Sequence, residues 1–299
     1  MCDARLVVPG ETYVVMRRCS ERRFFLRPDA KVTKMMRFCI AVAAQKYKMQ
    51  VHAAVVMSNH YHLVVTDLEG NMSLFMAWLN RVSALFLKVW RKRERGETIW
   101  SDEKFSSVLL LTPEAVLKQL VYVITNPMRD GLVNGHARWK GFVTKPDACL
   151  DKIDAPHPDR DIAAKKEKDS ALHITVPSCF RYMGKDEYVT MLEEAVAEEE
   201  KSLRKSRKGT PFLGMKEVLN KSASSRPTKA ERKHLKVNPQ FAGVTKEAIE
   251  YGKKLIRGFR KAYRDCIERY RRGETDIVFP KGTYWMRHFY NVRVADTWS

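Results

Sequence analysis

The sequence of 299 residues predicts an α+β fold, in which a ferredoxin-like (split βαβ) antiparallel sheet precedes a mainly α-helical, basic C-terminal region. The first observation behind this is the order of the local patterns, which reads strand, helix, strand, strand, helix, strand, helix up to about residue 126. The second is a change beyond residue 184, where helical patterns rich in lysine and arginine predominate. We expect the helices of the first part to cover one face of its sheet.

Three β-prone runs predict the first half of the sheet. Residues 12–18, TYVVMRR, are rich in β-branched and aromatic side chains. Asp29 can then cap a helix that is expected from about residue 31 to residue 48. The runs at 51–57 and 60–66 are separated by a Ser-Asn pair that favours a turn. They therefore predict a hairpin, which we place at the centre of the sheet.

The remaining elements of this part follow from capping residues and proline. Asn71 or Ser73 can begin a second helix that ends near Arg91. Residues 106–111, SSVLLL, predict the fourth strand. Thr112-Pro113 then opens a helix in the favoured order of cap and proline, and this helix is expected to end at Asn126, because a residue before proline is disfavoured in helical geometry.

The chain is expected to divide near residue 150. Residues 1–150 would form one domain. Residues 151–184 lose periodicity and gain proline and charge, which is typical of a linker or an excursion. Residues 185–299 would form the mainly helical basic region, with its longest helix from about residue 246 to residue 272.

Composition narrows the class of partner. Lys and Arg number 55 against 35 Asp and Glu, which gives a formal net charge of +20 and favours binding to polyanions. Nucleic acid is the first partner to consider, and a solubilising or ribosome-associated surface is the alternative. No apolar run approaches the length of a membrane span, so no membrane partner is expected. The six cysteines include no Cys-x-x-Cys pair, which argues against a zinc ribbon and fits a reducing cytoplasm.

Two histidines on the third strand form a candidate metal site. His60 and His62 project to the same face of a strand, while Tyr61 points the other way. Two imidazoles so placed can share one divalent ion, which would act as a Lewis acid on a phosphate oxygen. The alternative is a chance His-x-His with one imidazole buried and hydrogen-bonded. His52, one strand earlier, is expected to have a structural or supporting role.

Tyr122 is the candidate nucleophile. Asn126 lies four residues further on and therefore on the same helical face, where its amide oxygen could complete a metal site. A phenol has an ordinary pKa of about 10, so attack by tyrosine needs a polarised phosphate or a nearby base. The alternative is that Tyr122 is an ordinary helix residue and that Asn126 only caps the helix before Pro127.

These residues lie in two motifs that resemble a known family. The segment VHAAVVMSNHYHLVV resembles the His-hydrophobic-His motif of the HUH superfamily. The segment VYVITNPMRDGLV resembles the tyrosine helix of its single-tyrosine transposases, in particular the REP-associated tyrosine transposases. The resemblance extends in order and spacing over roughly residues 10–144. Together the two motifs are far more specific than either one alone.

The resemblance implies a transposase that cleaves and rejoins single-stranded DNA at hairpins. Residues 1–150 would be the catalytic domain, in which His60 and His62 bind Mg²⁺ or Mn²⁺ and Tyr122 forms a 5′-phosphotyrosine link. Asn126 stands where many relatives carry a glutamine that completes the metal shell, which makes it the expected third ligand. The partner would be single-stranded DNA or a DNA hairpin, and the location the bacterial cytoplasm at the nucleoid.

The basic residues near these motifs are candidate DNA contacts. They follow the first strand or lie on and after the second helix: Arg17, Arg18, Arg22, Arg23, Arg81, Arg91 and Lys92. Trp285 near the C-terminus is a further candidate, by stacking on bases, with packing onto the catalytic domain as the alternative. Residues 185–299 would bind DNA or cover the site, and the chain would be a monomer or a homodimer.

Three other functions are compatible with parts of this pattern. A domesticated DNA-binding protein would keep the fold with little or no transposition, although the intact His60, His62 and Tyr122 argue against it. A replication initiator or relaxase is disfavoured because neither a helicase-like domain nor a second nearby catalytic tyrosine is found. A metallohydrolase would use the histidines alone.

Overall fold

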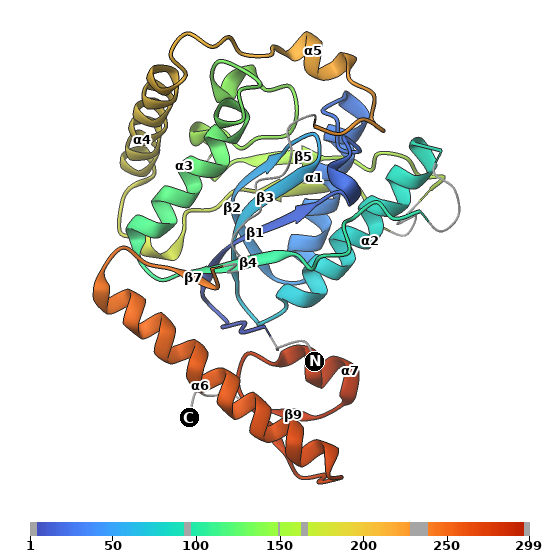
Figure 1. The fold of residues 1–299 in the computed structure, drawn as a ribbon, viewed down its shortest axis with the longest axis vertical. Helices are drawn as coiled ribbons and strands as arrows, with labels where there is room; N and C mark the ends of the chain where they lie inside the picture. Colours follow the sequence, from blue (N-terminus) through green and yellow to red (C-terminus); the bar gives the residue numbers. More distant parts are fainter. Residues whose placement is uncertain (1–4, 93–96, 149, 163–166, 228–238, 296–299) are drawn as a thin grey trace.

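A computed structural model gives the fold (Figure 1). It describes residues 5–92, 97–148, 150–162, 167–227 and 239–295. The side chains of Tyr284 and Trp285 are outside this description.

A mixed sheet of five strands forms the centre of the molecule, in the order β2-β3-β1-β4-β7. The four strands of the first part pair antiparallel, as predicted, and β7 joins the edge in parallel with β4. Their bounds are β1 Thr12–Arg18, β2 Met49–Val56, β3 His60–Asp67, β4 Ser106–Leu110 and β7 Phe241–Ala242. The α+β class is therefore confirmed. The expectation that the hairpin forms the centre of the sheet is wrong, because β2 is an edge strand and the hairpin joins the rest of the sheet only through the pairing of β3 with β1.

Helices α1 and α2 cover one face of this sheet. α1 spans Ala30–Lys46 and is capped by Asp29, whose side chain accepts a bond of 2.9 Å from the backbone N–H of Val32. α2 spans Met72–Trp90, and its apolar side pairs with α1 over the sheet. This face buries the largest core of the molecule, in which β3 takes part through Tyr61 and Leu63.

By length and composition α2 could also cross a membrane. Half of the helix is buried inside the protein, however, where side chains such as Phe75 and Phe86 are fully enclosed. Its apolar character is therefore accounted for by its place in the core.

Helix α3, Pro113–Arg129, lies on the opposite face, so the expectation that helices cover only one face is wrong. The reason is that both faces of β2 and β3 are apolar: Ala53 and Val55 of β2 and Val64 of β3 are buried against α3. The predicted end of α3 at Asn126 is also wrong. The helix continues through Pro127, and the backbone N–H of Asp130 bonds the carbonyl of Asn126 at 3.0 Å.

Residues 151–184, expected as a linker or an excursion, contain a small antiparallel hairpin of β5 Lys152–Ala155 and β6 Ser170–His173. The hairpin packs on α1, where Ala155, Leu172 and Ile174 are buried in the main core. Apolar residues at alternate positions of β5 and β6 account for this packing. The division of the chain at residues 150 and 184 stays a prediction.

The chain then returns over α3. α4, Lys185–Ser206, packs on α3 and buries Leu192 and Val196 there. α5 is a short helix at Met215–Asn220. Short 3-10 helices lie in the described connections, at η1 Ser20–Arg22, η2 His136–Arg138, η3 Pro146–Ala148 and η4 Ser178–Phe180.

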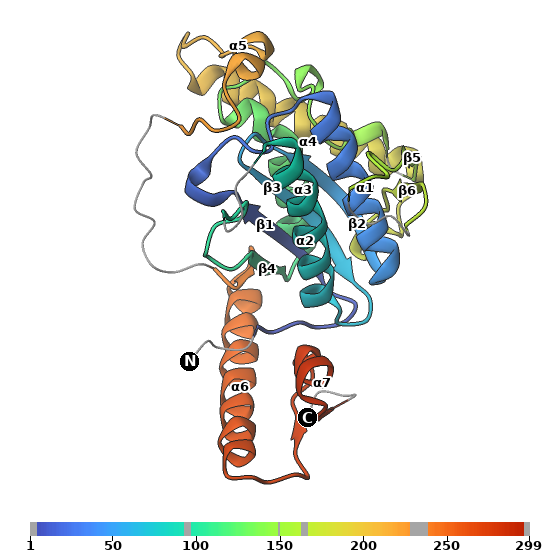
Figure 2. The ribbon, with the colours of Figure 1, turned by 90° about the vertical axis from the view of Figure 1, so that its right-hand side faces the viewer.

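The last part of the chain projects away from the sheet (Figure 2). It contains α6 Lys246–Arg271, β8 Val278–Phe279, α7 Tyr284–Tyr290 and β9 Arg293–Val294, with β8 and β9 paired in parallel. Tyr263, Phe279 and Met286 form a small core of their own. The long helix expected near 246–272 is confirmed.

Candidate active site

The two histidines lie at the beginning of β3, an interior strand of the sheet, on the face that α3 covers. Antiparallel pairing places Arg18 of β1 opposite His60 and Met16 opposite His62. Directly opposed residues share a face of the sheet, so Arg18 belongs to the same surface as His60. The same-face histidine pair predicted from the sequence thus stands on a strand that is bonded on both sides.

Three aromatic rings meet on this surface. The ring centroids of His60 and His62 are 5.0 Å apart, and those of His62 and Tyr122 are 5.5 Å apart, each pair nearly perpendicular. Tyr122 comes from α3, which Thr112 caps by accepting a bond of 3.3 Å from the backbone N–H of Ala115. The structure therefore brings together the candidate nucleophile and the candidate metal ligands.

His60 is oriented by Asn59, a residue that the sequence reasoning missed. Asn59 donates through its amide nitrogen to the carbonyl of Arg22 at 3.1 Å, which turns its oxygen toward His60. That oxygen lies 2.7 Å from Nδ1 of His60 and accepts its N–H. The Nε2 atom of a neutral His60 is then left with a lone pair, as a metal ligand requires. The signal in the sequence was the place of Asn59, a turn residue directly before His60.

Both histidines are neutral at physiological pH. Burial lowers the pKa of His60 to about 4, and the Arg18 guanidinium adds to the decrease. Burial also lowers the pKa of His62 well below 6.5, with smaller contributions from His60 and Arg18. Neutral imidazoles are the form that binds metal ions.

Asn126 is buried to 1% exposure, and its side-chain oxygen has no hydrogen-bond partner among the described residues. The Asn126 side chain acts on the pKa of both His60 and Tyr122, which places it beside the imidazole and the phenol. Because Asn126 lies inside α3, the alternative in which it only caps the helix is wrong. A buried amide oxygen without a partner is costly, and a ligand would relieve that cost.

These donors fit a divalent metal ion. No cluster of three or more His, Cys, Asp or Glu side chains that could hold a metal is found in the described part of the chain. A site here would consist of His60, His62 and the amide oxygen of Asn126, with phosphate oxygens as further ligands. This mixture of nitrogen and oxygen ligands suits Mn²⁺, and Mg²⁺ when phosphate and water provide most of the oxygens.

Tyr122 is half-buried and protonated at neutral pH. Burial raises its pKa above 10.0, and Asp130 adds to the rise, while Arg129 and Arg18 oppose it. The Arg129 guanidinium lies 5.1 Å from the centre of the Tyr122 ring, in a cation-π arrangement, and bonds Glu199 of α4 at 2.5 Å. Arg129 and Asp130 were missed, although their positions seven and eight residues after Tyr122 put them on the same face of α3.

The structure separates the expected DNA contacts into two groups. Arg18 joins the histidine face, and Arg22 follows in the 3-10 helix beside Asn59. Arg17 points to the opposite face, where its guanidinium donates to the carbonyls of Ser101, at 2.8 Å, and Glu103. Arg23 pairs with Glu21 at 2.8 Å.

The candidates on the second helix lie away from the rings. Arg91 donates to the carbonyl of Phe25 and pairs with Asp29 at 3.0 Å, so it links α2 to the cap of α1. Arg81 and Lys92 are exposed on α2 and at its end. Trp285 falls in α7, but its side chain is outside the described residues.

His52 is a structural residue. It is 3% exposed and lies at an irregularity between Val51 and Ala53 in the pairing of β2 with β3. Its Nδ1 bonds the carbonyl of Thr175 and its Nε2 bonds the hydroxyl of Thr66, both at 2.8 Å. Both ring nitrogens are therefore occupied within the fold.

Comparison with known proteins finds a family that is similar to the part of the chain that carries this arrangement. The family model described as "Transposase IS200 like" matches residues 8–122, from the start of β1 to the tyrosine. No curated protein sequence matches the chain.

Two solved structures are similar to parts of the chain. A REP-associated tyrosine transposase bound to a REP hairpin is 18% identical, with a TM-score of 0.39, over 46% of this chain and 79% of that chain. The tRNA(His) guanylyltransferase of Saccharomyces cerevisiae is 14% identical, with a TM-score of 0.33, over 43% of this chain and 63% of that one. These likenesses are too distant to assign an activity. The sequence similarity to the IS200-like transposase family covers residues 8–122, which contain both histidines and the tyrosine.

Proposed function

We propose that this protein is a DNA strand transferase that cleaves and rejoins single-stranded DNA at hairpin (palindromic) sequences through a 5′-phosphotyrosine intermediate. The observation that carries the proposal is the convergence of the Tyr122 phenol, the His60–His62 pair and the orphaned oxygen of Asn126 on one face of the sheet. The hairpin substrate is supported by the resemblance of the two sequence motifs to those of REP-associated tyrosine transposases. The net charge of +20 suits a nucleic-acid substrate held in the bacterial cytoplasm at the nucleoid.

Tyr122 would supply the nucleophile. Its Oη forms a bond to phosphorus while the bond from phosphorus to the 3′ oxygen breaks, which leaves the 5′ phosphate on the tyrosine. The phenol loses one proton and the departing 3′ oxygen gains one, so the step is balanced. Of the described groups that act on the pKa of Tyr122, only Asp130 is a base, and it is our candidate to receive the proton. Rejoining is the reverse attack by the 3′ hydroxyl of another strand.

The surrounding residues would position the phosphate. Arg18, opposite His60 on the sheet, provides positive charge where the phosphate must lie. Arg129 stacks against the phenol and favours its deprotonated form. A divalent ion bound by His60, His62 and Asn126 would withdraw charge from a phosphate oxygen and so make the phosphorus easier to attack. Asn59 keeps His60 in the tautomer whose Nε2 can bind the divalent ion.

The proposal is tested by trapping the covalent intermediate. The protein is incubated with labelled DNA hairpins and Mg²⁺ or Mn²⁺, and a protein-DNA band is sought on a denaturing gel. We expect a band with the wild-type protein that is lost in Tyr122→Phe and in the presence of a chelator. Tyr182→Phe is a matched control, since Tyr182 is 83% exposed and takes no part in the ring contacts of the site, and it should keep the band.

Two outcomes would contradict the mechanism. A band that persists in Tyr122→Phe would assign the nucleophile elsewhere. Hairpin binding without any covalent band, over all hairpins and both metals, would favour a domesticated DNA-binding protein.

A further inference from the structure

Helix α6 carries a basic surface that the proposed active site does not use. Between residues 253 and 264 the helix contains six Lys and Arg residues and no acidic residue. Four of them, Lys254, Arg257, Lys261 and Arg264, follow one another at intervals of three and four residues and are all exposed. Such spacing puts them on one side of the helix, which we call the basic face.

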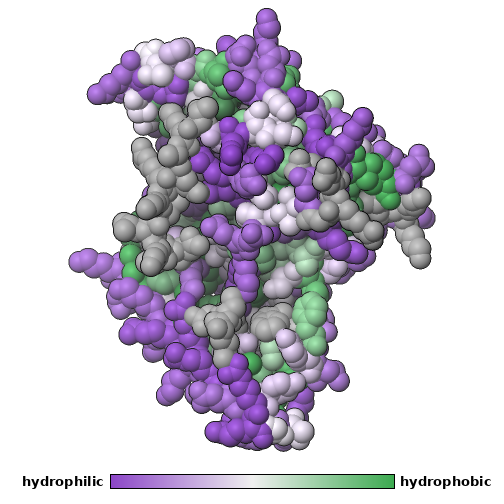
Figure 3. Space-filling model, turned by 45° about the vertical axis from the view of Figure 1, so that its right-hand side comes forward, coloured by the Kyte–Doolittle hydropathy of each residue, from purple (hydrophilic) through white to green (hydrophobic). Residues whose placement is uncertain are grey.

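The opposite side of α6 is fixed to the protein. Gly252, Ile256, Phe259 and Tyr263 are buried, and Gly252 rests directly on the ring of Phe241 in β7. The basic face must therefore point to solvent. Figure 3 shows mainly hydrophilic side chains along the edge of the lower part of the molecule, where α6 lies.

No ion pair with an acid is found for the four residues of the basic face within the described part of the chain. Arg257 donates only to the backbone carbonyl of Lys253, at 3.3 Å. Other cations of the helix do have acidic partners, as in Lys253 with Glu250 and Arg269 with Glu274, both at 2.7 Å. Such pairs stabilise a helix that is exposed to solvent. The basic face lacks them over about 15 Å of helix, so its charges are suited to binding an external polyanion.

Gly258 adds a feature of shape to the charge of the basic face. It lies four residues after Lys254 and three before Lys261, and a Cβ there would meet nothing within 4 Å. A glycine in the middle of a helix costs about 1 kcal/mol relative to alanine. Without a side chain at this point, the helix backbone can approach a partner closely, between the two lysines.

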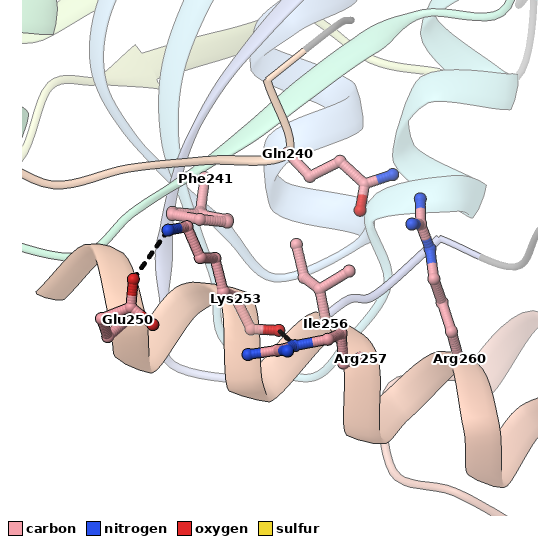
Figure 4. Close-up of a pocket in the computed structure, with 7 residues that line it drawn as sticks. All are labelled: Gln240, Phe241, Glu250, Lys253, Ile256, Arg257 and Arg260. Atoms are coloured by element: carbon pink, nitrogen blue, oxygen red, sulfur yellow. Dashed lines mark hydrogen bonds and ion pairs between the residues drawn. The ribbon is translucent and has the colours of Figure 1, made fainter.

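A pocket extends the basic surface to the edge of the sheet. It has a volume of about 510 Å³ and lies where α6 meets β7, beside Gln240 and Phe241 (Figure 4). Lys253, Arg257 and Arg260 contribute three cations to its wall, against the single acid Glu250. Arg257 belongs both to this wall and to the basic face, so the pocket adjoins the basic face.

We propose that the basic face of α6 binds the phosphate backbone of a DNA duplex, which would be the stem of the hairpin or the duplex beside it. This rests on the proposed function for the identity of the nucleic acid. The surface is separate from the reacting groups: β7 pairs with β4 at Leu109, which is level with Tyr13 of β1, whereas His62 is level with Met16 and His60 with Arg18. Three to five residues of strand separate these levels by about 10–17 Å, so α6 would hold DNA some base pairs from the cleaved phosphate.

The test measures duplex binding by the full-length protein in a chelator, so that no cleavage interferes. Lys254→Gln with Lys261→Gln removes two charges from the basic face, and Lys145→Gln with Lys152→Gln removes two exposed charges elsewhere. For a short DNA duplex of mixed sequence, we expect the first pair to weaken binding on the order of tenfold and to lower the slope of log K against log salt by about two. The control pair should change both quantities little.

Gly258→Gln tests whether the helix backbone contacts the duplex closely. It adds a side chain without changing the charge, so it leaves the general electrostatic attraction unaltered. We expect weaker duplex binding with an unchanged slope. Wild-type affinity in Gly258→Gln, wild-type affinity in the lysine pair, or an equal loss in the control pair would each overturn the proposal. Tighter binding of an RNA duplex of the same sequence would also overturn it.

A separate readout distinguishes this inference from the proposed function. On a hairpin that forms the covalent band with the wild type and whose stem is too short to reach α6, the lysine variant should form the band as well as the wild type. Failure of the wild type to form a band on any hairpin would refute the strand-transfer mechanism and leave the duplex measurements valid.

Discussion

Two asparagines flank the histidine pair and behave in opposite ways. Asn59 uses both ends of its amide, one on the Arg22 carbonyl and one on His60. Asn126 is buried with an oxygen that bonds no described residue. The hydrogen bonds of Asn59 are therefore complete without a ligand, whereas the oxygen of Asn126 is left without a partner. Removing Asn126 should therefore affect metal-dependent steps far more than folding.

Asn126→Ala should reduce cleavage by at least about tenfold, since even indirect partners of metal ligands contribute about 10–100-fold to metal affinity or activity. Hairpin binding measured in a chelator should remain close to that of the wild type. Asn126→Gln, which keeps an amide oxygen, should restore part of the activity at raised Mn²⁺. Cleavage at the wild-type rate in Asn126→Ala would remove the residue from the site.

His52 makes the stability of the protein depend on pH. Burial lowers the pKa of His52 to about 4 in the folded protein, against 6.5 ordinarily. The unfolded chain therefore binds a proton that the folded chain does not, between these two values. The stabilisation is complete above pH 6.5 and is lost as the pH falls to about 4, and the loss amounts to about 3 kcal/mol.

Urea unfolding of the wild type and His52→Gln at several pH values measures this contribution. The difference between their free energies of unfolding should shrink as the pH falls from 6.5 to 4. His173→Gln changes an exposed histidine and should leave the pH dependence of the wild type unaltered. Parallel curves for the wild type and His52→Gln would show that His52 does not titrate as described.

At the scale of elements, the two ends of α3 show where sequence patterns are reliable. The start of α3 at Thr112-Pro113 was predicted, because a cap and a proline act locally. Its end was predicted three residues too early, because Pro127 forbids one hydrogen bond without forbidding the next turn, in which Asp130 bonds Asn126. This extra turn is what places Arg129 over the Tyr122 ring.

Two glycines of α6 should respond oppositely to the same substitution. A Cβ at Gly252 would lie 2.5 Å from the ring of Phe241, whereas one at Gly258 would meet open space. Gly258→Ala should raise the free energy of unfolding by about 0.5–1 kcal/mol through helix propensity. Gly252→Ala should lower the stability of the α6 contact, because the ring and its strand must shift. Thermal unfolding and amide exchange of α6 measure both effects, and a stabilised Gly252→Ala would show that α6 does not rest on Phe241.

At the scale of the whole molecule, the parts predicted from sequence are those that neighbours in sequence determine. The strand at 12–18, the hairpin and the same-face histidines follow from alternation and a turn. The site also required α3 to cross the histidine face, and this was supplied by the family resemblance and not by periodicity.

The parts that were not predicted depend on distant pairings. β7 has two residues, too few for any strand pattern, and it becomes a strand only because β4 offers it bonds. The hairpin of β5 and β6 lies in a segment dominated by charge and proline, and the burial of Leu172 on α1 is decided by tertiary contact. Asn59 and Asp130 were missed for the same reason, since their roles depend on residues of other elements or on burial.

The pairing of β7 with β4 also bears on self-association. On that side the N–H groups of Leu109 and Leu111 already donate to the carbonyls of Gln240 and Ala242. On the other side, Val51, Ala54 and Val56 of β2 bond segments near residues 142–144 and 175. A continuous intermolecular sheet needs an edge with unsatisfied backbone groups. Within the described part of the chain, these stretches of β2 and β4 are thus covered from within, and the two-residue strand β7 takes the place of β4 at that border, so the five-stranded sheet offers only short edges to a second copy of the chain.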